Sequence, residues 1–185
     1  LDHAGQEIDV SALHQGFLRQ FKSGGGTVML KTEVLALAQH SSHWRITTKD
    51  RDIEAGIVVN AAGAWADKLG QMVEAEHIGL LPKRRTAAMI AAPHKLGPDF
   101  PMTIDIEEQF YIKPDAGRLL ISPADETLSA PCDAQPEELD IAICVDRIEK
   151  AFDLSVRRIE SKWAGLRSFV ADGAPVTGFS QRVDG

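Results

Sequence analysis

Three strand-like runs in the middle of the chain constrain its fold more than any other feature. They are KRRTAAMIAAP (83–93), MTIDIEEQFYIKP (102–114) and GRLLISPADET (117–127), and turns that contain Gly or Pro separate them. The tripeptide Ala116–Arg118 stands where a tight hairpin would turn. Strands joined by turns this short pair antiparallel, so this part of the chain is predicted to form an antiparallel sheet.

A helix is predicted directly after these runs, in PEELDIAICVDRIEKAF (136–152). Proline is favoured at the first position of a helix, and the two glutamates that follow suit the positive end of the helix dipole. The helix carries an apolar stripe of Ile141, Val145, Ile148 and Phe152. We expect this helix to lie on the sheet, with Cys144 as a core residue.

The first 80 residues indicate a different architecture. Residues 9–26 show helical spacing of apolar residues and end in glycines. One or two strands are expected in 27–39, another in 43–50, a turn in 50–54, and a short helix in about 64–73. The continuous apolar run AGIVVN (55–60) is typical of a strand buried on both faces of a parallel-type sheet. This region is therefore predicted to be part of an α/β domain.

The end of the chain, SVRRIESKWAGLRSFVADGAPVTGFS (155–180), predicts one strand, a turn at Asp172-Gly173 and the start of a further strand. Together these patterns give a fold class of α/β in the wider, α+β sense. An antiparallel sheet with a covering helix is added to a piece of an α/β domain. The sequence begins at Leu1 without an initiator methionine and ends just after the start of the last expected strand. We therefore expect it to be an internal part of a longer protein.

Composition narrows the function classes. The net charge is −7, from 20 basic and 27 acidic residues, and no Lys/Arg-rich block is present. A nucleic-acid partner is disfavoured because phosphate binding needs a basic surface. No apolar run approaches the roughly 20 residues of a membrane span, and Cys132 and Cys144 match neither a redox pair nor a zinc site. A cytoplasmic, reducing setting is the expectation, with attachment to the periphery of the inner membrane left open.

The segment VVNAAGAWA (58–66) is the first candidate site. Small residues replace large ones at the end of the expected strand, and Trp65 follows at once. Absent side chains would let a phosphate-containing ligand approach the backbone at a helix start. The alternative is tight packing of helix on sheet, which Ala and Gly also permit. The residues alone favour the packing interpretation.

Arginine and tyrosine side chains are the other candidates. Arg167 follows a Gly-Leu pair near a strand end, and its planar guanidinium could grip a carboxylate. Lys83–Arg85 is a basic cluster, and Tyr111 is the one tyrosine of the chain. Each also has an ordinary interpretation as a solvated surface residue or a residue at the edge of a sheet. His40 and His43 lack a third metal ligand nearby, so no metal site is predicted.

Four phrases, in this order, carry a family resemblance: IVVNAAGAWA, LPKRR, FYIKPDAGRLLISPADET and WAGLRSFVADGAPVTG. The chain resembles the D-amino-acid oxidase-type superfamily of FAD-dependent oxidoreductases over nearly its whole length. It is most similar to the bacterial FAD-dependent D-arginine dehydrogenases and the glycine oxidase-like enzymes. The G-x-G-x-x-G unit with which such enzymes begin does not occur in this sequence.

The resemblance implies three regions. Residues 1–80 would be a partial FAD-binding domain that lacks its N-terminal G-x-G-x-x-G unit. Residues 81–170 would be a substrate-binding domain built on an antiparallel sheet, and residues 171–185 would return toward the FAD-binding domain. The cofactor would be non-covalent FAD in the parent protein, because no cysteine is placed for a covalent flavin link.

The resemblance also implies a role for individual residues. Ala61, Ala62 and Gly63 would pass close to FAD, with Trp65 beside it, and the backbone of Val34 would meet the adenine. The substrate carboxylate would be bound by the side chains of Arg85, Tyr111 and Arg167. The apolar wall of the pocket would come from Met102 and Ile104. No residue is assigned a catalytic role.

The activity implied is oxidation of the Cα–N bond of a free amino acid, with a D-amino acid expected, to an imine and then to a 2-oxo acid and ammonia. The chain alone is expected to be inactive. Two alternatives stay open: a binding or scaffold domain of the same fold, and a flavin dehydrogenase for a 2-hydroxy acid or glycerol phosphate. The residues do not distinguish oxygen from a quinone as electron acceptor.

Overall fold

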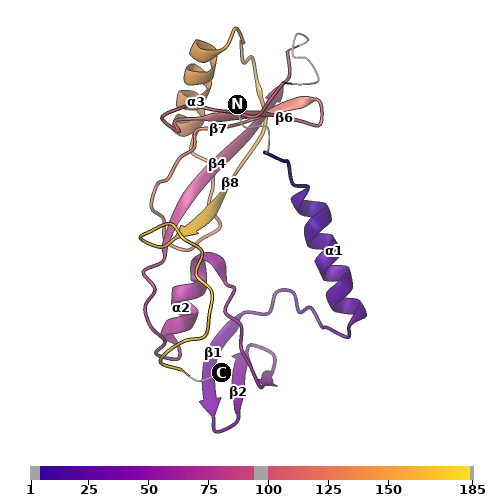
Figure 1. Cartoon of the computed structure of the whole chain (residues 1–185), viewed down its shortest axis with the longest axis vertical. Helices are drawn as coiled ribbons and strands as arrows, with labels where there is room; N and C mark the ends of the chain where they lie inside the picture. Colours follow the sequence, from indigo (N-terminus) through magenta and orange to yellow (C-terminus); the bar gives the residue numbers. More distant parts are fainter. Residues whose placement is uncertain (1–4, 94–99, 184–185) are drawn as a thin grey trace.

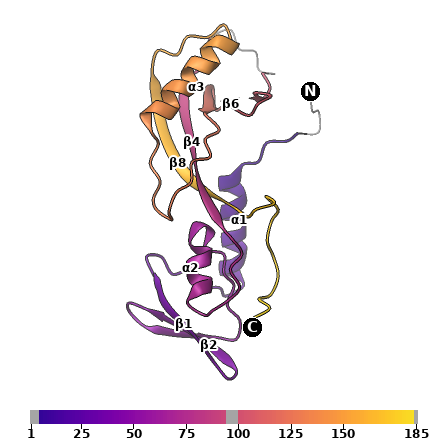
Figure 2. The same cartoon turned by 90° about the vertical axis from the view of Figure 1, so that its left-hand side faces the viewer.

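The computed structural model describes residues 5–93 and 100–183. Two lobes are joined by two long strands, and Figures 1 and 2 show them from two sides. In chain order the elements are α1 (Val10–Ser23), β1 (Val34–His40), β2 (His43–Thr48), β3 (Asp52–Ala55), the 3₁₀ helix η1 (Gly63–Trp65), α2 (Ala66–Gln71), β4 (Leu81–Ala91), β5 (Thr103–Ile104), β6 (Tyr111–Asp115), β7 (Arg118–Ser122), α3 (Glu138–Ala151) and β8 (Ile159–Phe169).

The larger sheet has five strands in the order β5-β6-β7-β4-β8, and every neighbouring pair is antiparallel. Helix α3 packs on one face of it (Figure 1), and its residues Ile141, Cys144 and Ile148 are buried. Cys144 and Ile148 belong to one core cluster with inward-facing residues of the strands, including Ile112 and Ile121. The predicted antiparallel sheet with a covering helix is confirmed, as is the buried position of Cys144.

The hairpin between β6 and β7 turns where the sequence predicted. Asp115 pairs with Arg118, so Ala116 and Gly117 form a two-residue loop. Both have positive φ, 47° and 78°, which is the geometry of a type I′ turn. This turn matches the natural twist of the two strands and fixes their register.

The smaller lobe contains a three-stranded antiparallel sheet, β1-β2-β3, with Trp44 buried. The sequence predicted β2 and the region of β1, but it assigned residues 50–54 to a turn, where β3 begins at Asp52. Strands β4 and β8 span 11 residues each and run between the lobes, so they carry residues of the larger sheet close to η1 and α2 (Figures 1 and 2).

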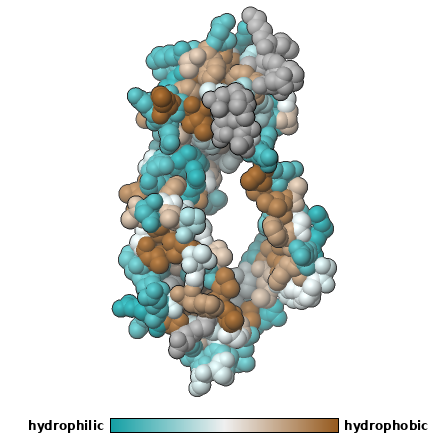
Figure 3. Space-filling view, viewed as in Figure 1, coloured by the Kyte–Doolittle hydropathy of each residue, from teal (hydrophilic) through white to brown (hydrophobic). Residues whose placement is uncertain are grey.

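Helix α1 begins as predicted. The side chain of Asp9 caps it by accepting a hydrogen bond from the backbone N–H of Ala12 at 2.8 Å. Its apolar stripe is nevertheless exposed: Val10, Leu13, Phe17 and Phe21 are each more than half accessible to solvent. Helix α1 stands apart from the rest of the chain in Figure 1, and Figure 3 shows its apolar side chains on the surface beside an open gap.

Two further sequence-based expectations are wrong. Residues 55–60 do not form a buried strand beyond Ala55, the last residue of β3. Ile57 and Val59 are 62% and 82% exposed, because no strand of the described residues pairs with this segment and no layer covers it. Residues 174–178 are likewise irregular rather than the start of a strand, although the predicted turn at Asp172-Gly173 forms, with the N–H of Gly173 donating to the carbonyl of Val170.

Within the described ranges, no helix has both the length and the apolar character needed to cross a bilayer.

Candidate functional site

The candidate site lies on the face of the five-stranded sheet that turns away from α3, here called the distal face. Residues that pair directly in an antiparallel ladder project to the same side of the sheet. Lys83 pairs with Arg167, Arg85 with Gly165, and Ala87 with Trp163. Ala88 and Ile90, at the alternate positions of β4, belong to the core beneath α3. These pairs place Lys83, Arg85 and Ala87 of β4 on the distal face, together with Trp163, Gly165 and Arg167 of β8.

Tyr111 joins this face from β6. It pairs with Ser122 of β7, while its neighbour Ile112 pairs with Ile121 in the core. Ile104 of β5 pairs with Tyr111, so it lies on the distal face too. Ile104 is 57% exposed and Met102, which precedes β5, is 51% exposed. Both predicted pocket-wall residues are thus available at this edge of the sheet.

The register brings the three predicted carboxylate-binding residues within reach of one another. Standard sheet spacing places the Cα atoms of Arg85 and Arg167 roughly 8 Å apart, and those of Arg85 and Tyr111 about 12 Å apart. Only the small side chains of Ala87 and Ser122 lie between Arg85 and Tyr111 in the register. Long side chains on these positions can therefore converge above a shallow floor.

Arg85 is largely buried, with 17% of its side chain exposed, and one terminal nitrogen donates to Oε1 of Glu126 at 3.0 Å. Its Nε atom is buried and has no hydrogen-bond partner. An unpartnered buried N–H is costly, so this guanidinium retains an unmet capacity to donate. Arg167 is exposed, and its guanidinium lies 5.3 Å from the centre of the Phe169 ring.

Glu126 joins two of the cations. Its Oε2 accepts from Lys83 Nζ at 2.7 Å while its Oε1 accepts from Arg85. The hydrogen bond from Lys83, and then the positive charges of Lys83, Arg85 and Arg167, lower the pKa of Glu126 below its usual value, although burial acts in the opposite direction. Glu126 is therefore an anion at neutral pH, and 47% of its side chain is open to solvent.

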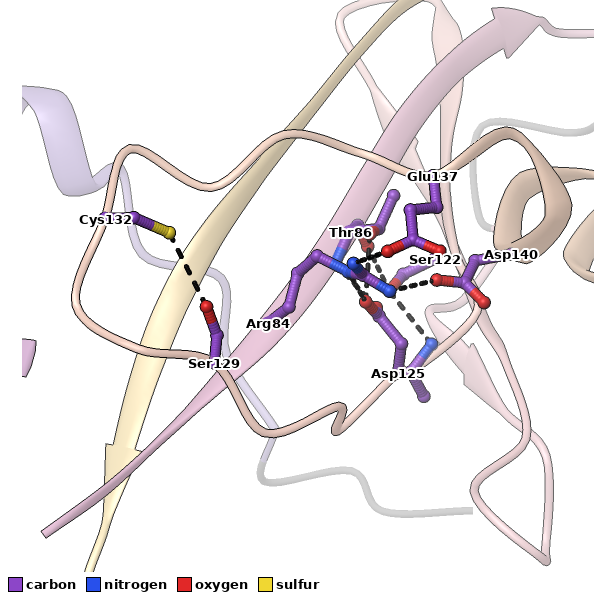
Figure 4. A network of polar contacts seen from close by, with 9 residues as sticks. Arg84, Thr86, Ser122, Asp125, Ser129, Cys132, Glu137 and Asp140 are labelled. Carbon is purple, nitrogen blue, oxygen red and sulfur yellow. Dashed lines mark hydrogen bonds and ion pairs between the residues drawn. The ribbon is translucent and has the colours of Figure 1, made fainter.

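The preceding residue, Asp125, contacts side chains on the opposite face of β4, the face toward α3. Figure 4 shows the network: Asp125 accepts from Arg84 at 3.2 Å and from the N–H and hydroxyl of Thr86 at 2.6 and 2.9 Å. Arg84 also pairs with Glu137 and with Asp140 of α3. Burial alone would lower the pKa of Arg84, but its carboxylate partners raise it above the usual value. This network ties β4 to the start of α3.

The predicted cofactor-binding corner, residues 61–65, is held by Asn60. Its side-chain amide donates to the carbonyl of Ala66 at 2.8 Å, and its oxygen accepts from the N–H of Ala62 at 3.3 Å. Gly63 has φ +55°, and a Cβ added there would meet no atom within 4 Å. Ala61 and Gly63 are exposed, and Trp65 is 43% exposed. This segment, here called the bare corner, is exposed at Ala61 and Gly63, whereas Ala64 is buried.

Helix η1, which contains Gly63 and Trp65, contacts strand β8, which carries Arg167. The fold thus brings the bare corner up against a strand of the distal face, although they are about a hundred residues apart in sequence. Val34 does not join them: it is the first residue of β1, in the three-stranded sheet.

Sequence reasoning did not identify two residues of the distal face, Trp163 and Gly165. The alternation W-A-G-L-R was the available signal, because alternate residues of a strand share a face with Arg167. His40 and His43 stack with ring centroids 5.5 Å apart. In the ranges 5–93 and 100–183, no group of three or more His, Cys, Asp or Glu residues is placed to hold a metal ion.

The whole chain, residues 1–185, matches the family described as DAO, FAD dependent oxidoreductase. The mitochondrial glycerol-3-phosphate dehydrogenase of Schizosaccharomyces pombe is 30% identical over 149 residues, which are 71% of this chain and 23% of that protein. The mitochondrial dimethylglycine dehydrogenase of Homo sapiens is 29% identical over 120 residues, 63% of this chain and 14% of that protein.

Among solved structures, the crystal structure of glycine oxidase from Geobacillus kaustophilus aligns with a TM-score of 0.64 and 25% identity. The alignment covers 85% of this chain and 41% of the oxidase. The chain therefore belongs to the DAO family of FAD-dependent oxidoreductases, and FAD is the cofactor that this membership indicates. It spans less than half the length of each of these relatives.

Proposed function

We propose that this chain supplies the substrate-binding sheet and one cofactor edge of an FAD-dependent oxidoreductase that oxidises the Cα–N bond of a free amino acid. A D-amino acid is the expected substrate. The substrate carboxylate binds to Arg85, Arg167 and Tyr111. The products are an imine and then, after hydrolysis, a 2-oxo acid and ammonia.

The observation that carries the proposal is that Arg85, Tyr111 and Arg167 share the distal face although they come from three different strands. The buried, unpartnered Nε of Arg85 adds to it, because a carboxylate oxygen would satisfy that atom. Two guanidiniums and a phenol suit a carboxylate, since each charge-assisted hydrogen bond contributes about 1.5–3 kcal/mol net.

The task of these residues is orientation. When bound, FAD supplies the hydride acceptor for the reaction. A carboxylate fixed at two or three points leaves the Cα–H bond of the amino acid with few orientations, which lowers the entropic cost of hydride transfer. The exposed corner at Ala61–Gly63 fits a flat cofactor that lies against the backbone, because no side chain fills the space above Gly63.

A second candidate substrate is glycerol phosphate. It is favoured by the curated relatives named glycerol-3-phosphate dehydrogenase and by the three cations of the distal face, which also suit a phosphate group. Relatives named for glycine and dimethylglycine favour the amino acid instead. A binding or scaffold domain without redox activity is the third alternative.

The test uses the complete parent protein, purified with its flavin. D-arginine, other D-amino acids, glycine, 2-hydroxy acids and sn-glycerol 3-phosphate are added without oxygen, and the flavin absorbance near about 450 nm is followed. The proposal expects bleaching by an amino acid, and Arg167→Met should lower kcat/KM by about 10- to 1,000-fold. If glycerol phosphate bleaches the flavin and no amino acid does, glycerol phosphate is the substrate and the amino-acid proposal is wrong. If the purified protein binds no flavin, only the scaffold function is left.

A further inference from the structure

We propose that Glu126 selects the charge of the ligand bound at the distal face, favouring zwitterionic amino acids over doubly charged anions such as phosphate monoesters. This inference rests on the proposed function, in which Arg85, Arg167 and Tyr111 bind the substrate carboxylate. Lys83, Arg85 and Arg167 are the three cations around Glu126, here called the cluster. The inference gives Glu126 a role in selecting the substrate class, because its carboxylate places a negative charge among these cations.

The backbone around Glu126 is held in place on the edge of β4. The N–H of Arg84 donates to the carbonyl of Thr127 at 2.8 Å, and the N–H of Ser129 donates to the carbonyl of Pro82 at 3.0 Å. Asp125 anchors the residue before it through Arg84 and Thr86. The backbone at Glu126 is therefore held by contacts on both sides of it, which keeps its carboxylate within hydrogen-bond reach of Lys83 and Arg85.

The charges of the cluster follow from its members. Lys83, Arg85 and Arg167 contribute three positive charges, and the carboxylate of Glu126 offsets one of these charges. Both carboxylate oxygens already accept a hydrogen bond, one from Lys83 and one from Arg85. Each oxygen has a further lone pair, and nearly half of the side chain faces solvent. A ligand's ammonium group can therefore donate to Glu126 without displacing either cation.

This arrangement treats the two substrate classes differently. An amino acid places its carboxylate on the guanidiniums and its ammonium beside Glu126, so both of its charges meet an opposite charge. A phosphate monoester has two negative charges and no cation, so one of its charges meets Glu126 unfavourably. Like-charge contacts of this kind discriminate against the wrong ligand.

The experiment uses the complete parent protein at low ionic strength and about pH 8, where inorganic phosphate is mainly a dianion. Acetate, glycine and inorganic phosphate are the probes, and the carbon-13 signals of the Arg85 and Arg167 guanidinium groups are followed by NMR. The variants are Glu126→Gln and Glu126→Met. Glu138→Gln is the matched control, because it also removes a carboxylate paired with a lysine, Lys162, on the α3 side of the sheet.

We expect Glu126→Gln and Glu126→Met to tighten phosphate binding by about three- to tenfold and to reduce the preference for glycine over acetate by a similar factor. Glu138→Gln should change neither. An unchanged phosphate-to-glycine ratio in both Glu126 variants would overturn the selector role while leaving the carboxylate site in place. If no probe shifts the arginine signals in any variant, the proposed substrate site is itself wrong and the selector role fails with it.

Discussion

Gly165 lies directly opposite Arg85 in the antiparallel ladder of β4 and β8. Trp163 and Arg167 stand on either side of it on the same face. A Cβ at Gly165 would meet no atom within 4 Å, and its φ is not in the left-handed region. The glycine therefore leaves a bare slot beside Arg85, between an indole and a guanidinium, and nothing in its backbone conformation requires glycine there.

Filling this slot should block the site without unfolding the protein. We expect Gly165→Leu in the parent flavoprotein to raise KM for the substrate at least about tenfold, because the isobutyl group would occupy the space in front of Arg85. Gly165→Ala should have a much smaller effect. Circular dichroism and the flavin spectrum should match the wild type, and an unchanged KM in Gly165→Leu would place the substrate elsewhere.

The Arg84 network should be a determinant of stability. Arg84→Met would leave the carboxylate of Asp125, which is 6% exposed, without its guanidinium partner. Breaking a buried ion pair in this way costs about 3 kcal/mol, which would be visible as a lower midpoint of urea denaturation. Arg118→Met is the control: its pair with Glu160 is long, at 3.9 Å, and its side chain is 45% exposed. That control should lose less than about 0.5 kcal/mol.

Attachment of the C-terminal segment should depend on pH. The hydroxyl of Ser180 and the N–H of Gln181 donate to Glu76 at 2.6 and 3.0 Å, and these bonds lower the pKa of Glu76 below its usual 4.5. A lowered pKa in the folded state stabilises the contact above pH 4.5, and that stabilisation is lost as the pH falls through the folded-state pKa.

Hydrogen-exchange protection of the amides of Gln181 and Val183 measures this attachment. After correction for the intrinsic exchange rate, protection should be higher at about pH 6 than at about pH 3. In Glu76→Gln the amide oxygen can still accept from the N–H of Gln181 and the amide nitrogen faces the Ser180 hydroxyl, which can accept from it. This side chain does not titrate, so the difference between the two pH values should vanish. A pH dependence that persists in this variant would assign the effect to another carboxylate.

The two thiols should differ sharply in reactivity. Burial raises the pKa of Cys144 to about 12, so its thiolate is scarce at neutral pH. Cys132 is exposed, with its Sγ 3.5 Å from the hydroxyl of Ser129 (Figure 4). A disulfide reagent should modify one thiol in the native chain and two after denaturation. Cys132→Ser should abolish the native reaction, and a fast native reaction in that variant would contradict the buried position of Cys144.

Much of the larger lobe could be predicted from the sequence. Period-two alternation and the turn at Ala116-Gly117 specify the hairpin of β6 and β7, and the stripe that includes Ile141 and Ile148 specifies how α3 packs. These features are local, so a short window of sequence contains them. The apolar run at 55–60 was wrongly read as a buried strand, because burial depends on neighbouring layers that the run itself does not specify.

The bare corner at residues 61–65 was also visible in the sequence, because it depends on which side chains are small. The sequence did not show whether this corner binds a cofactor, since the same small residues also suit tight packing of a helix on a sheet. The contact between η1 and β8 is a tertiary fact, and it alone brings the corner close to the strand of Arg167.

The basic cluster Lys83-Arg84-Arg85 separates the two kinds of information most clearly. The strand pattern alone determined that Arg84 projects to one face of β4 and its two neighbours to the other. Only the tertiary structure decided that Arg84 points to α3 and the carboxylates of Asp125 and Asp140, while Arg85 shares a face with Tyr111 and Arg167. The reason is physical: alternation is a property of a single strand, but the meaning of each face depends on what the other strands and α3 place beside it.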